Sequence, residues 1–224
     1  MGEGRSSEQA ARRHAGTSAR EAGGRPERQL TAFKGVYRLQ LPSHRDARGV
    51  FSPVWVRADL RKLGLDTDLA QVNMATNPVA GTLRGLHYQL PPFTEVKIVQ
   101  VITGAIFDVV VDLRPSSPTF RRAMGLRLDA HSRSALYLPK GMAHGYQTLV
   151  PDTTVLYTVS AAFSPEHQRG LHWSDKSLAI VWPLSPTLVS PRDQELPALQ
   201  DVTEFPEDRR DSPAHLLALD GERS

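Results

Sequence analysis

Two apolar runs follow one another across a single glycine in residues 96–113, VKIVQVITGAIFDVVVDL. Both are rich in valine and isoleucine and are bounded by turn-forming residues, a pattern typical of β-strands. Further strands are predicted at residues 135–138, 146–149 and 153–159, whereas only residues 58–64 have the pattern of a short helix, with a glycine at its end. Many short strands and few helices predict an all-β fold, a closed barrel or double-sheet jelly roll, and such barrels commonly hold one small ligand in the mouth.

Composition restricts the class of protein. The chain has 224 residues, of which 40% are hydrophobic, so it can bury a substantial core. Its 27 Lys and Arg exceed its 24 Asp and Glu by three; this small excess is a weak indication of an anionic ligand, and no basic stripe with interleaved aromatic residues predicts nucleic-acid binding. The lack of cysteine excludes disulfides and thiolate catalysis and agrees with a cytoplasmic location. No apolar run approaches the roughly 20 residues of a membrane span.

Large apolar residues are concentrated in the middle of the chain. Residues 1–29 consist mainly of Gly, Ser, Ala, Glu and Arg, so burial there cannot offset the entropy lost on ordering. The far end is similarly polar and contains two prolines. We therefore expect a disordered leader at residues 1–29, one domain at residues 30–200 and a polar tail at residues 201–224.

Polar side chains gather in residues 81–99. Arg84, His87 and Gln89 lie on one expected strand, and Lys97 lies on the next. In a regular strand Arg84 would point away from His87, but a β-bulge at Gly85 would bring both into one cavity. Because a buried lysine is costly without an anionic partner, we expect this segment to form the floor of an active site.

Other candidate site residues are spread along the chain. Gln71 and Asn73 share a strand face, where buried amides would need polar partners. His144 begins a new strand after a turn rich in Pro and Gly. Tyr157 lies on the apolar face of its strand, where a tyrosine usually belongs to the core; opposite His87 it would act as an acid.

The remaining polar residues have a structural and a functional interpretation. Arg48 follows an aspartate in a turn, and either a solvated arginine or a functional one fits that pattern. For Asp108 and Asp112 we expect cross-strand hydrogen bonds or pairing with nearby arginines. Asp193 lies in a late loop, where a single acidic residue is usually solvated.

Several motifs occur together in family order and spacing. They are LRGLHYQ at 83–89, VVVDLR at 109–114 with SPTF at 117–120, AHG at 143–145 and IVWP at 180–183. In these motifs the sequence resembles the dTDP-4-dehydrorhamnose 3,5-epimerases over residues 35 to 197. The resemblance implies a cupin-type jelly roll, a metal-independent epimerase without a cofactor, a nucleotide-diphosphate sugar as substrate, and a homodimer with shared active sites.

The resemblance also implies roles for single residues. His87 would be the general base, held by Asp193, and Tyr157 the acid on the opposite face of the sugar, while Lys97 would lie near the sugar carbonyl. The implied substrate-binding residues are Arg84 and His144 near the diphosphate or sugar, Gln71 and Asn73 along the site, Arg48 and Phe51 lent to the partner subunit, and Gln89, Phe163 and Arg192.

The chemistry explains these residue types. In a 4-keto-6-deoxy sugar the carbonyl acidifies the hydrogens on C3 and C5, and inversion removes a proton from one face and returns one to the other. Histidine, with an ordinary pKa of about 6.5, is a neutral base at cell pH, and tyrosine, at about 10, keeps its proton until the enolate takes it. A fixed lysine stabilises the charge on the carbonyl oxygen, an effect often worth about 3 kcal/mol or more.

Two other classes of function remain open. The segment 139–144, PKGMAH, is similar to the second cupin motif and would suit a metal-dependent isomerase or oxygenase, but the first motif needs His-x-His where this chain has His87-Tyr88-Gln89. A binding protein that kept the pocket without catalysis is the second alternative. Departures from the family pattern leave the nucleotide base, and the choice among 3-, 5- and 3,5-epimerisation, open; they are Pro53, Ala75, Phe163 and Gln168.

Overall fold

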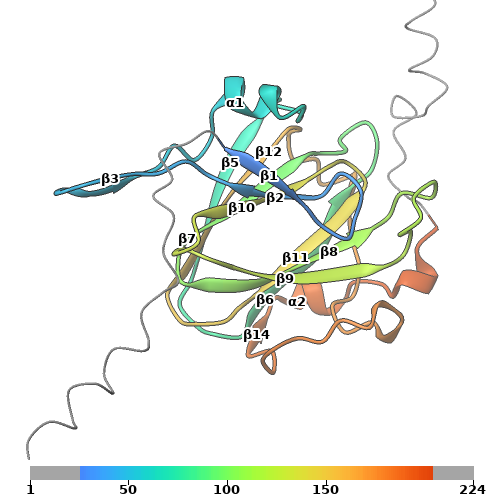
Figure 1. The fold of residues 1–224 in the computed structure, drawn as a ribbon. Helices are drawn as coiled ribbons and strands as arrows, with labels where there is room; N and C mark the ends of the chain where they lie inside the picture. Colours follow the sequence, from blue (N-terminus) through green and yellow to red (C-terminus); the bar gives the residue numbers. More distant parts are fainter. Residues whose placement is uncertain (1–25, 204–224) are drawn as a thin grey trace, which may run out of the picture.

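The computed structural model describes residues 26–203, which form two β-sheets packed face to face with few short helices (Figure 1). The first sheet has the order β1 (Glu27–Leu30), β2 (Tyr37–Gln40), β10 (Ser134–Leu138), β7 (Lys97–Thr103), β12 (Thr153–Val159), β5 (Gln71–Asn77). The second has the order β13 (Gln168–Gly170), β6 (Thr82–Gln89), β11 (Met142–Thr148), β8 (Ala105–Asp112), β9 (Ala123–Asp129), and β14 (Leu188–Val189) pairs with β6 in parallel. The other elements are a hairpin of β3 (His44–Asp46) and β4 (Gly49–Phe51), and the helical segments α1 (Arg57–Lys62), η1 (Lys176–Leu178), α2 (Pro191–Gln194) and η2 (Leu199–Asp201).

Between β5 and β13, each connection except the one from β8 to β9 passes from one sheet to the other. This alternation builds a jelly roll, so the predicted all-β class is confirmed. The inward side chains of both sheets meet in one apolar cluster, in which Val99 and Val101 of β7 pack with Val110 of β8 and Val155 of β12. Val99 and Val101 of β7 therefore point inward, and the two-residue period of a strand places Lys97 on the same face.

Both outer faces are also covered. The helix α1 buries Leu60 against the first sheet, and residues of the C-terminal segment such as Leu171 and Leu199 cover the second. Because β8 is buried on both faces, Val109, Val110 and Val111 are all inaccessible to solvent. The predicted helix at 58–64 is confirmed with slightly earlier bounds, and Gly64 follows it in a left-handed conformation (φ +69°).

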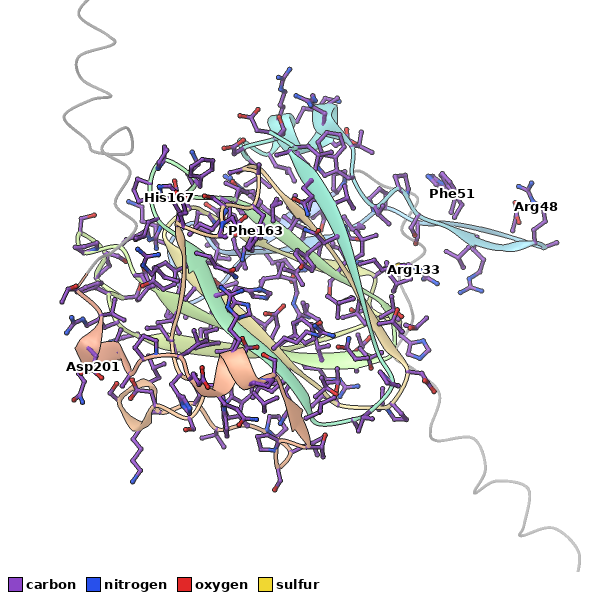
Figure 2. The ribbon with its side chains drawn as sticks, turned by 180° about the vertical axis from the view of Figure 1, so that it is seen from behind. Arg48, Phe51, Arg133, Phe163, His167 and Asp201 are labelled. Carbon is purple, nitrogen blue, oxygen red and sulfur yellow. The ribbon has the colours of Figure 1, made fainter. Side chains whose placement is uncertain are left out.

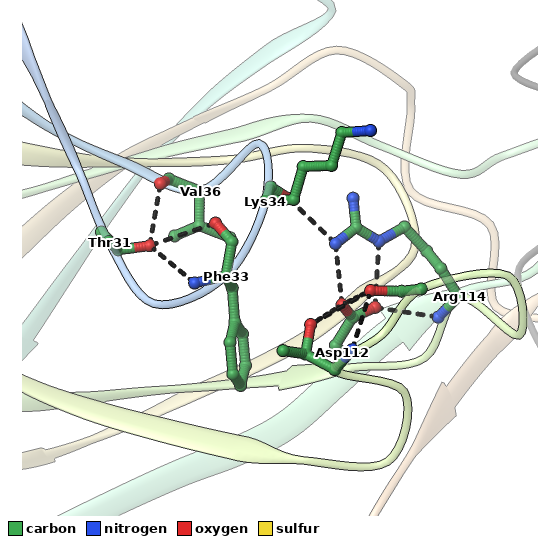
Figure 3. Close-up of polar contacts among 8 residues, drawn as sticks. Thr31, Phe33, Lys34, Val36, Asp112 and Arg114 are labelled. Carbon is green, nitrogen blue, oxygen red and sulfur yellow. Dashed lines mark hydrogen bonds and ion pairs between the residues drawn. The ribbon is translucent and has the colours of Figure 1, made fainter.

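An ion pair of Asp112 and Arg114 ties the turn at Lys34 to the end of β8. Asp112 is inaccessible to solvent and accepts hydrogen bonds from Arg114 (2.7 Å and 2.9 Å), Ser117 (2.6 Å) and Thr119 (2.6 Å) (Figure 3). The same guanidinium donates to the carbonyl of Lys34 at 2.9 Å. The predicted pairing of Asp112 with an arginine is confirmed, and the pair fixes the loop that leaves β8.

Secondary structure extends past both expected domain boundaries. Strand β1 pairs with β2 from Glu27 onward, inside the range expected as leader, 1–29. At the other end η2 reaches Asp201 and Val202 is buried, inside the range expected as tail, 201–224. The rest of both ranges, residues 1–25 and 204–224, lies outside the described residues. No helix within 26–203 has the length and apolar character of a transmembrane helix.

Candidate active site

A bulge in β6 turns two polar side chains into one space. Strand β11 pairs Tyr146 with Arg84 and His144 with His87, so two residues along β11 match three along β6. The bulge contains Gly85, whose φ is +101° and where an added β-carbon would lie 2.7 Å from the carbonyl oxygen of His144. The predicted bulge is therefore confirmed, and glycine is needed there for both backbone conformation and space.

These residues open into a cavity of about 480 Å³ between the two sheets. The volume falls in the range of sites that hold one small ligand, roughly 300–1,000 Å³. Residues from both sheets and from the segment 188–193 line it. Among the residues expected at the site, the cavity contains His87, Tyr157, Asp193, Lys97, Arg84, His144 and Arg192.

A carboxylate holds the imidazole of His87. Nε2 of His87 lies 2.7 Å from Oδ1 of Asp193, while the backbone amide of Gly85 donates to Oδ2 at 3.0 Å. Burial would raise the pKa of Asp193, but the hydrogen bonds from His87 and from the Gly85 amide outweigh it and keep that pKa below its ordinary value. An ionised carboxylate only accepts, so Nε2 carries the proton and Nδ1 is left as a base.

The position of Asp193 depends on the C-terminal segment. Strand β14 pairs in parallel with the start of β6, and α2 begins directly after it with Ser190 as its N-cap and Pro191 in its first turn. This brings a side chain that is only 6% exposed against His87, which is 29% exposed. The usual solvation of an acidic residue in a late loop therefore does not apply to Asp193.

A second histidine of the cavity, His144, is also paired with a carboxylate, Asp108, which does not itself line the cavity. Nε2 of His144 lies 2.6 Å from Oδ1 of Asp108, and both side chains are buried. Oδ2 of Asp108 has no hydrogen-bond partner among the described residues. The expected cross-strand hydrogen bond of Asp108 is confirmed, with a cavity histidine as its partner.

Tyr157 approaches from the first sheet, whereas His87 comes from the second. It lies on β12 between Asn73 of β5 and Val99 of β7, and its ring packs against the inter-sheet cluster. Burial raises the pKa of the Tyr157 phenol; the charge of Arg84 opposes this shift, and a nearby carboxylate adds to it. The phenol therefore holds its proton at neutral pH.

Lys97 is the cavity's ammonium group. Its Nζ lies 3.0 Å from Oε1 of Glu95, and the two side chains are 11% and 12% exposed. The anionic partner that a buried lysine requires is thus two residues away on the chain.

Two expected substrate-binding residues lie along the edge strand β5. Gln71 is exposed and Asn73 is half-buried, and the amide of Gln71 donates to that of Asn73. They share a face of β5 with Ala75, which does line the cavity. The prediction that the two amides share a face is confirmed, but neither lines the cavity.

Gln89 and Phe163 also lie outside the cavity lining. Gln89 is buried, with its amide bonded to the carbonyls of Phe93 and Ala162 and to the backbone N–H of Ser164. These hydrogen bonds hold two loops together, and the substrate-binding role of Gln89 stays a prediction. Phe163 lies in one of these loops, between Ala162 and Ser164, and its side chain is exposed (Figure 2).

Arg48 and Phe51 lie on a hairpin that projects from the sandwich (Figure 2). The side chain of Arg48 is 90% exposed and pairs with Asp46 at 2.6 Å, and Phe51 is 68% exposed. Neither residue lines the cavity of its own chain.

Sequence reasoning missed three residues that support the cavity. Arg84 donates through Nε to Oδ1 of buried Asn77 at 2.8 Å, and the buried Tyr146 phenol lines the wall. Burial raises the pKa of Tyr146 to about 12. The third residue is Glu95, the ionic partner of Lys97. Its spacing of two from Lys97 was a usable signal, since residues two apart share a strand face.

The metal-dependent alternative can be tested against the donor groups present. Within residues 26–203, no group of three or more His, Cys, Asp or Glu side chains is arranged to hold a metal ion. His87 and His144 face each other across β6 and β11, but each already bonds its own carboxylate through Nε2.

Fold and cavity together define a class. A jelly roll holds, in one cavity, a histidine whose tautomer a carboxylate fixes and a protonated tyrosine from the opposite sheet. This is the constellation of an acid–base isomerase that needs two groups on opposite faces of its substrate.

Comparison with known proteins gives the family. The dTDP-4-dehydrorhamnose 3,5-epimerase family matches residues 30–201. A dTDP-4-dehydrorhamnose 3,5-epimerase of Sinorhizobium fredii is 43% identical over 158 residues, 70% of this chain and 81% of the relative. A dTDP-4-dehydrorhamnose 3-epimerase of Streptomyces niveus is 39% identical over 165 residues, 73% of this chain and 79% of the relative.

A solved structure agrees with this assignment. The dTDP-4-dehydrorhamnose 3,5-epimerase of Bacillus anthracis, crystallised with TDP and PPi bound, superposes with a TM-score of 0.76 at 41% identity, covering 78% of this chain and 99% of that one. The chain belongs to the dTDP-4-dehydrorhamnose 3,5-epimerase family and is an isomerase of that type.

Proposed function

We propose that the protein epimerises a dTDP-linked 4-keto-6-deoxyhexose at C3, at C5 or at both, with His87 as base and Tyr157 as acid. One observation carries the proposal: the two groups come from opposite sheets into one cavity, and the base is held by a carboxylate at 2.7 Å. A hexose between them would present one face to each.

The proton transfers follow from this arrangement. Nδ1 of His87 takes the proton from the carbon beside the carbonyl, and the electrons of the C–H bond form an enolate whose charge lies on the C4 oxygen. The ammonium of Lys97 donates a hydrogen bond to that oxygen. The hydroxyl of Tyr157 then gives its proton to the other face of the same carbon, and exchange with water restores both residues. Where both carbons are inverted, the same steps act on the second one.

The cationic groups of the cavity suit a diphosphate. Arg84 and Arg192 both line it, and each donates to a neutral amide, that of Asn77 at 2.8 Å and that of Gln168 at 2.6 Å. A neutral acceptor leaves the guanidinium charge available to an anionic ligand. The relative crystallised with TDP and PPi supports a nucleoside diphosphate as part of the substrate.

A second copy of the chain would complete the site. Arg48 and Phe51 are exposed on the projecting hairpin, and the edge strand β5 exposes Val72 and Met74. We infer a homodimer in which the hairpin of one protomer carries these two residues to the rim of the partner's cavity, where Gln71 and Asn73 lie. Sedimentation of the purified protein tests this dimer.

Deuterium exchange tests the reaction. In deuterated water, NMR of dTDP-4-keto-6-deoxyglucose shows which of C3 and C5 exchanges and which is inverted. His87→Ala is expected to abolish exchange, and Tyr157→Phe to abolish completed inversion. Ligand binding without exchange would instead indicate a non-catalytic binding protein, and exchange at the normal rate in His87→Ala would refute the assigned base.

A further inference from the structure

The carboxylate of Glu95 is fixed by two groups. Its Oε1 lies 3.0 Å from Nζ of Lys97, and its Oε2 accepts a hydrogen bond from Nε2 of Gln89 at 3.3 Å. The amide of Gln89 is in turn bonded to backbone groups of two loops, so it cannot turn away without breaking those bonds. A rigid amide therefore orients the carboxylate, and the carboxylate orients the ammonium.

The burial of this pair separates it from the exposed ion pairs of the surface. Both side chains are about one-tenth exposed, whereas Lys62 and Asp59, 3.6 Å apart on α1, are 63% and 27% exposed. A charged ammonium at the wall of a cavity needs an ionic or hydrogen-bonding partner. Glu95 supplies that partner without itself lining the cavity.

We propose that Glu95 is a positioning residue of the reaction, which fixes the ammonium of Lys97 at the place where the substrate carbonyl oxygen becomes negative. The inference rests on the proposed function, in which Lys97 and Tyr157 touch the sugar. Because the charge of the enolate exists only beyond the ground state, the orientation of Lys97 acts on turnover and hardly on binding.

Glu95 has a second effect, on the phenol. Its charge opposes the ionisation of Tyr157, while the charge of Arg84 favours it, and burial is the larger cause that keeps the pKa of Tyr157 high. The other titratable or charged groups that line the cavity with Tyr157 are Lys97, His87, His144, Tyr146, Arg192 and Asp193. Removal of the Glu95 charge is therefore expected to lower the pH at which the acid is lost.

The test compares Glu95→Gln with the unchanged protein. We expect kcat for deuterium exchange to fall about a hundredfold, the size of a lost fixed electrostatic contact, and the affinity for dTDP to change by less than about threefold. The alkaline limb of the pH profile of kcat should move to lower pH. Glu95→Asp keeps the charge and should return the alkaline limb to its original pH. Asp59→Asn removes the partner of an exposed lysine and should change neither kcat nor the alkaline limb.

A measurement without substrate keeps the two proposals distinguishable. The tyrosinate absorbance of Glu95→Gln, minus that of the same variant carrying Tyr157→Phe, gives the titration of Tyr157 alone. An active protein in which Glu95→Gln leaves kcat, the pH limb and this titration unchanged would overturn the role of Glu95. A fall of kcat with an unmoved limb and titration would show a merely structural role and overturn it too. An unchanged protein without exchange on any dTDP-4-keto-hexose would overturn the proposed function.

Discussion

Replacement of Asp193 by asparagine tests the fixed tautomer of His87. The carboxylate accepts two N–H groups at once, Nε2–H of His87 at 2.7 Å and the amide of Gly85 at 3.0 Å. Asparagine offers one oxygen and one NH₂ group. The backbone N–H of Gly85 can only donate, so the oxygen must turn to it and the NH₂ group must face His87.

The consequence for the base can be worked out from this geometry. Facing an NH₂ group, Nε2 of His87 must accept, and the imidazole then carries its proton on Nδ1, the nitrogen that the mechanism needs as base. In a serine-protease triad a tautomer reversed in this way lowers kcat about 10⁴-fold. For Asp193→Asn we expect a fall of about 10³ to 10⁴, which is roughly 4–5.5 kcal/mol in the barrier at 1.36 kcal/mol for each factor of ten.

The assay is the single-turnover rate of deuterium incorporation at C3 and C5, measured with the melting temperature of the variant. Asp175→Asn is the matched control, because Asp175 also accepts two backbone N–H groups, from Ser177 and Leu199, but does not line the cavity. It should lower stability and leave exchange unchanged. Exchange by Asp193→Asn within tenfold of the unchanged rate would refute the tautomer argument.

Three further predictions concern charge and backbone. Arg84→Gln should weaken dTDP binding about 10- to 100-fold in calorimetry, the size of a lost charge-assisted hydrogen bond. It should also move the alkaline limb of the pH profile of kcat to higher pH, because the Arg84 charge lowers the pKa of Tyr157. Burial raises the pKa of Asp112, but its hydrogen bonds outweigh burial, so the native pKa lies below the ordinary value of 3.8. The stabilisation from Asp112 is therefore present above pH 3.8 and is lost as the pH falls through the native pKa. Asp112→Asn should cost about 3 kcal/mol in urea unfolding at pH 7. Gly85→Ala should cost more than about 2 kcal/mol, since its β-carbon would meet backbone atoms, whereas Gly49→Ala (φ +131°), with no atom within 4 Å, should cost only the backbone term of about 1 kcal/mol.

The strands could be predicted from the sequence because their periodicity is local. Residues 96–103 show which side chains point inward, and β7 (Lys97–Thr103) places Lys97, Val99 and Val101 as that period requires. The face of β8 was harder to interpret, since both of its faces are buried and alternation carries no signal there.

The site was less accessible to sequence reasoning, because its parts are distant along the chain. His87 and Asp193 are 106 residues apart, and the parallel pairing of β14 with β6 that joins them leaves no periodic pattern. The role of Asp193 came from family resemblance. Gln89, two residues from His87 in sequence, bonds the backbone of two loops, because a buried amide bonds the backbone groups that its neighbours leave unsatisfied. Nothing in the local sequence pattern indicates those partners.

The bulge and the base are coupled through one side chain. Oδ2 of Asp193 accepts from the amide of Gly85, the bulge residue, while Oδ1 accepts from His87 two positions later. The backbone irregularity that brings Arg84 and His87 into the same cavity is thus bonded to the group that fixes the tautomer of the base. A regular strand would break both relations at once, because Arg84 would turn outward and the Gly85 amide would return to the ladder. Geometry and protonation at this site therefore depend on the same three residues.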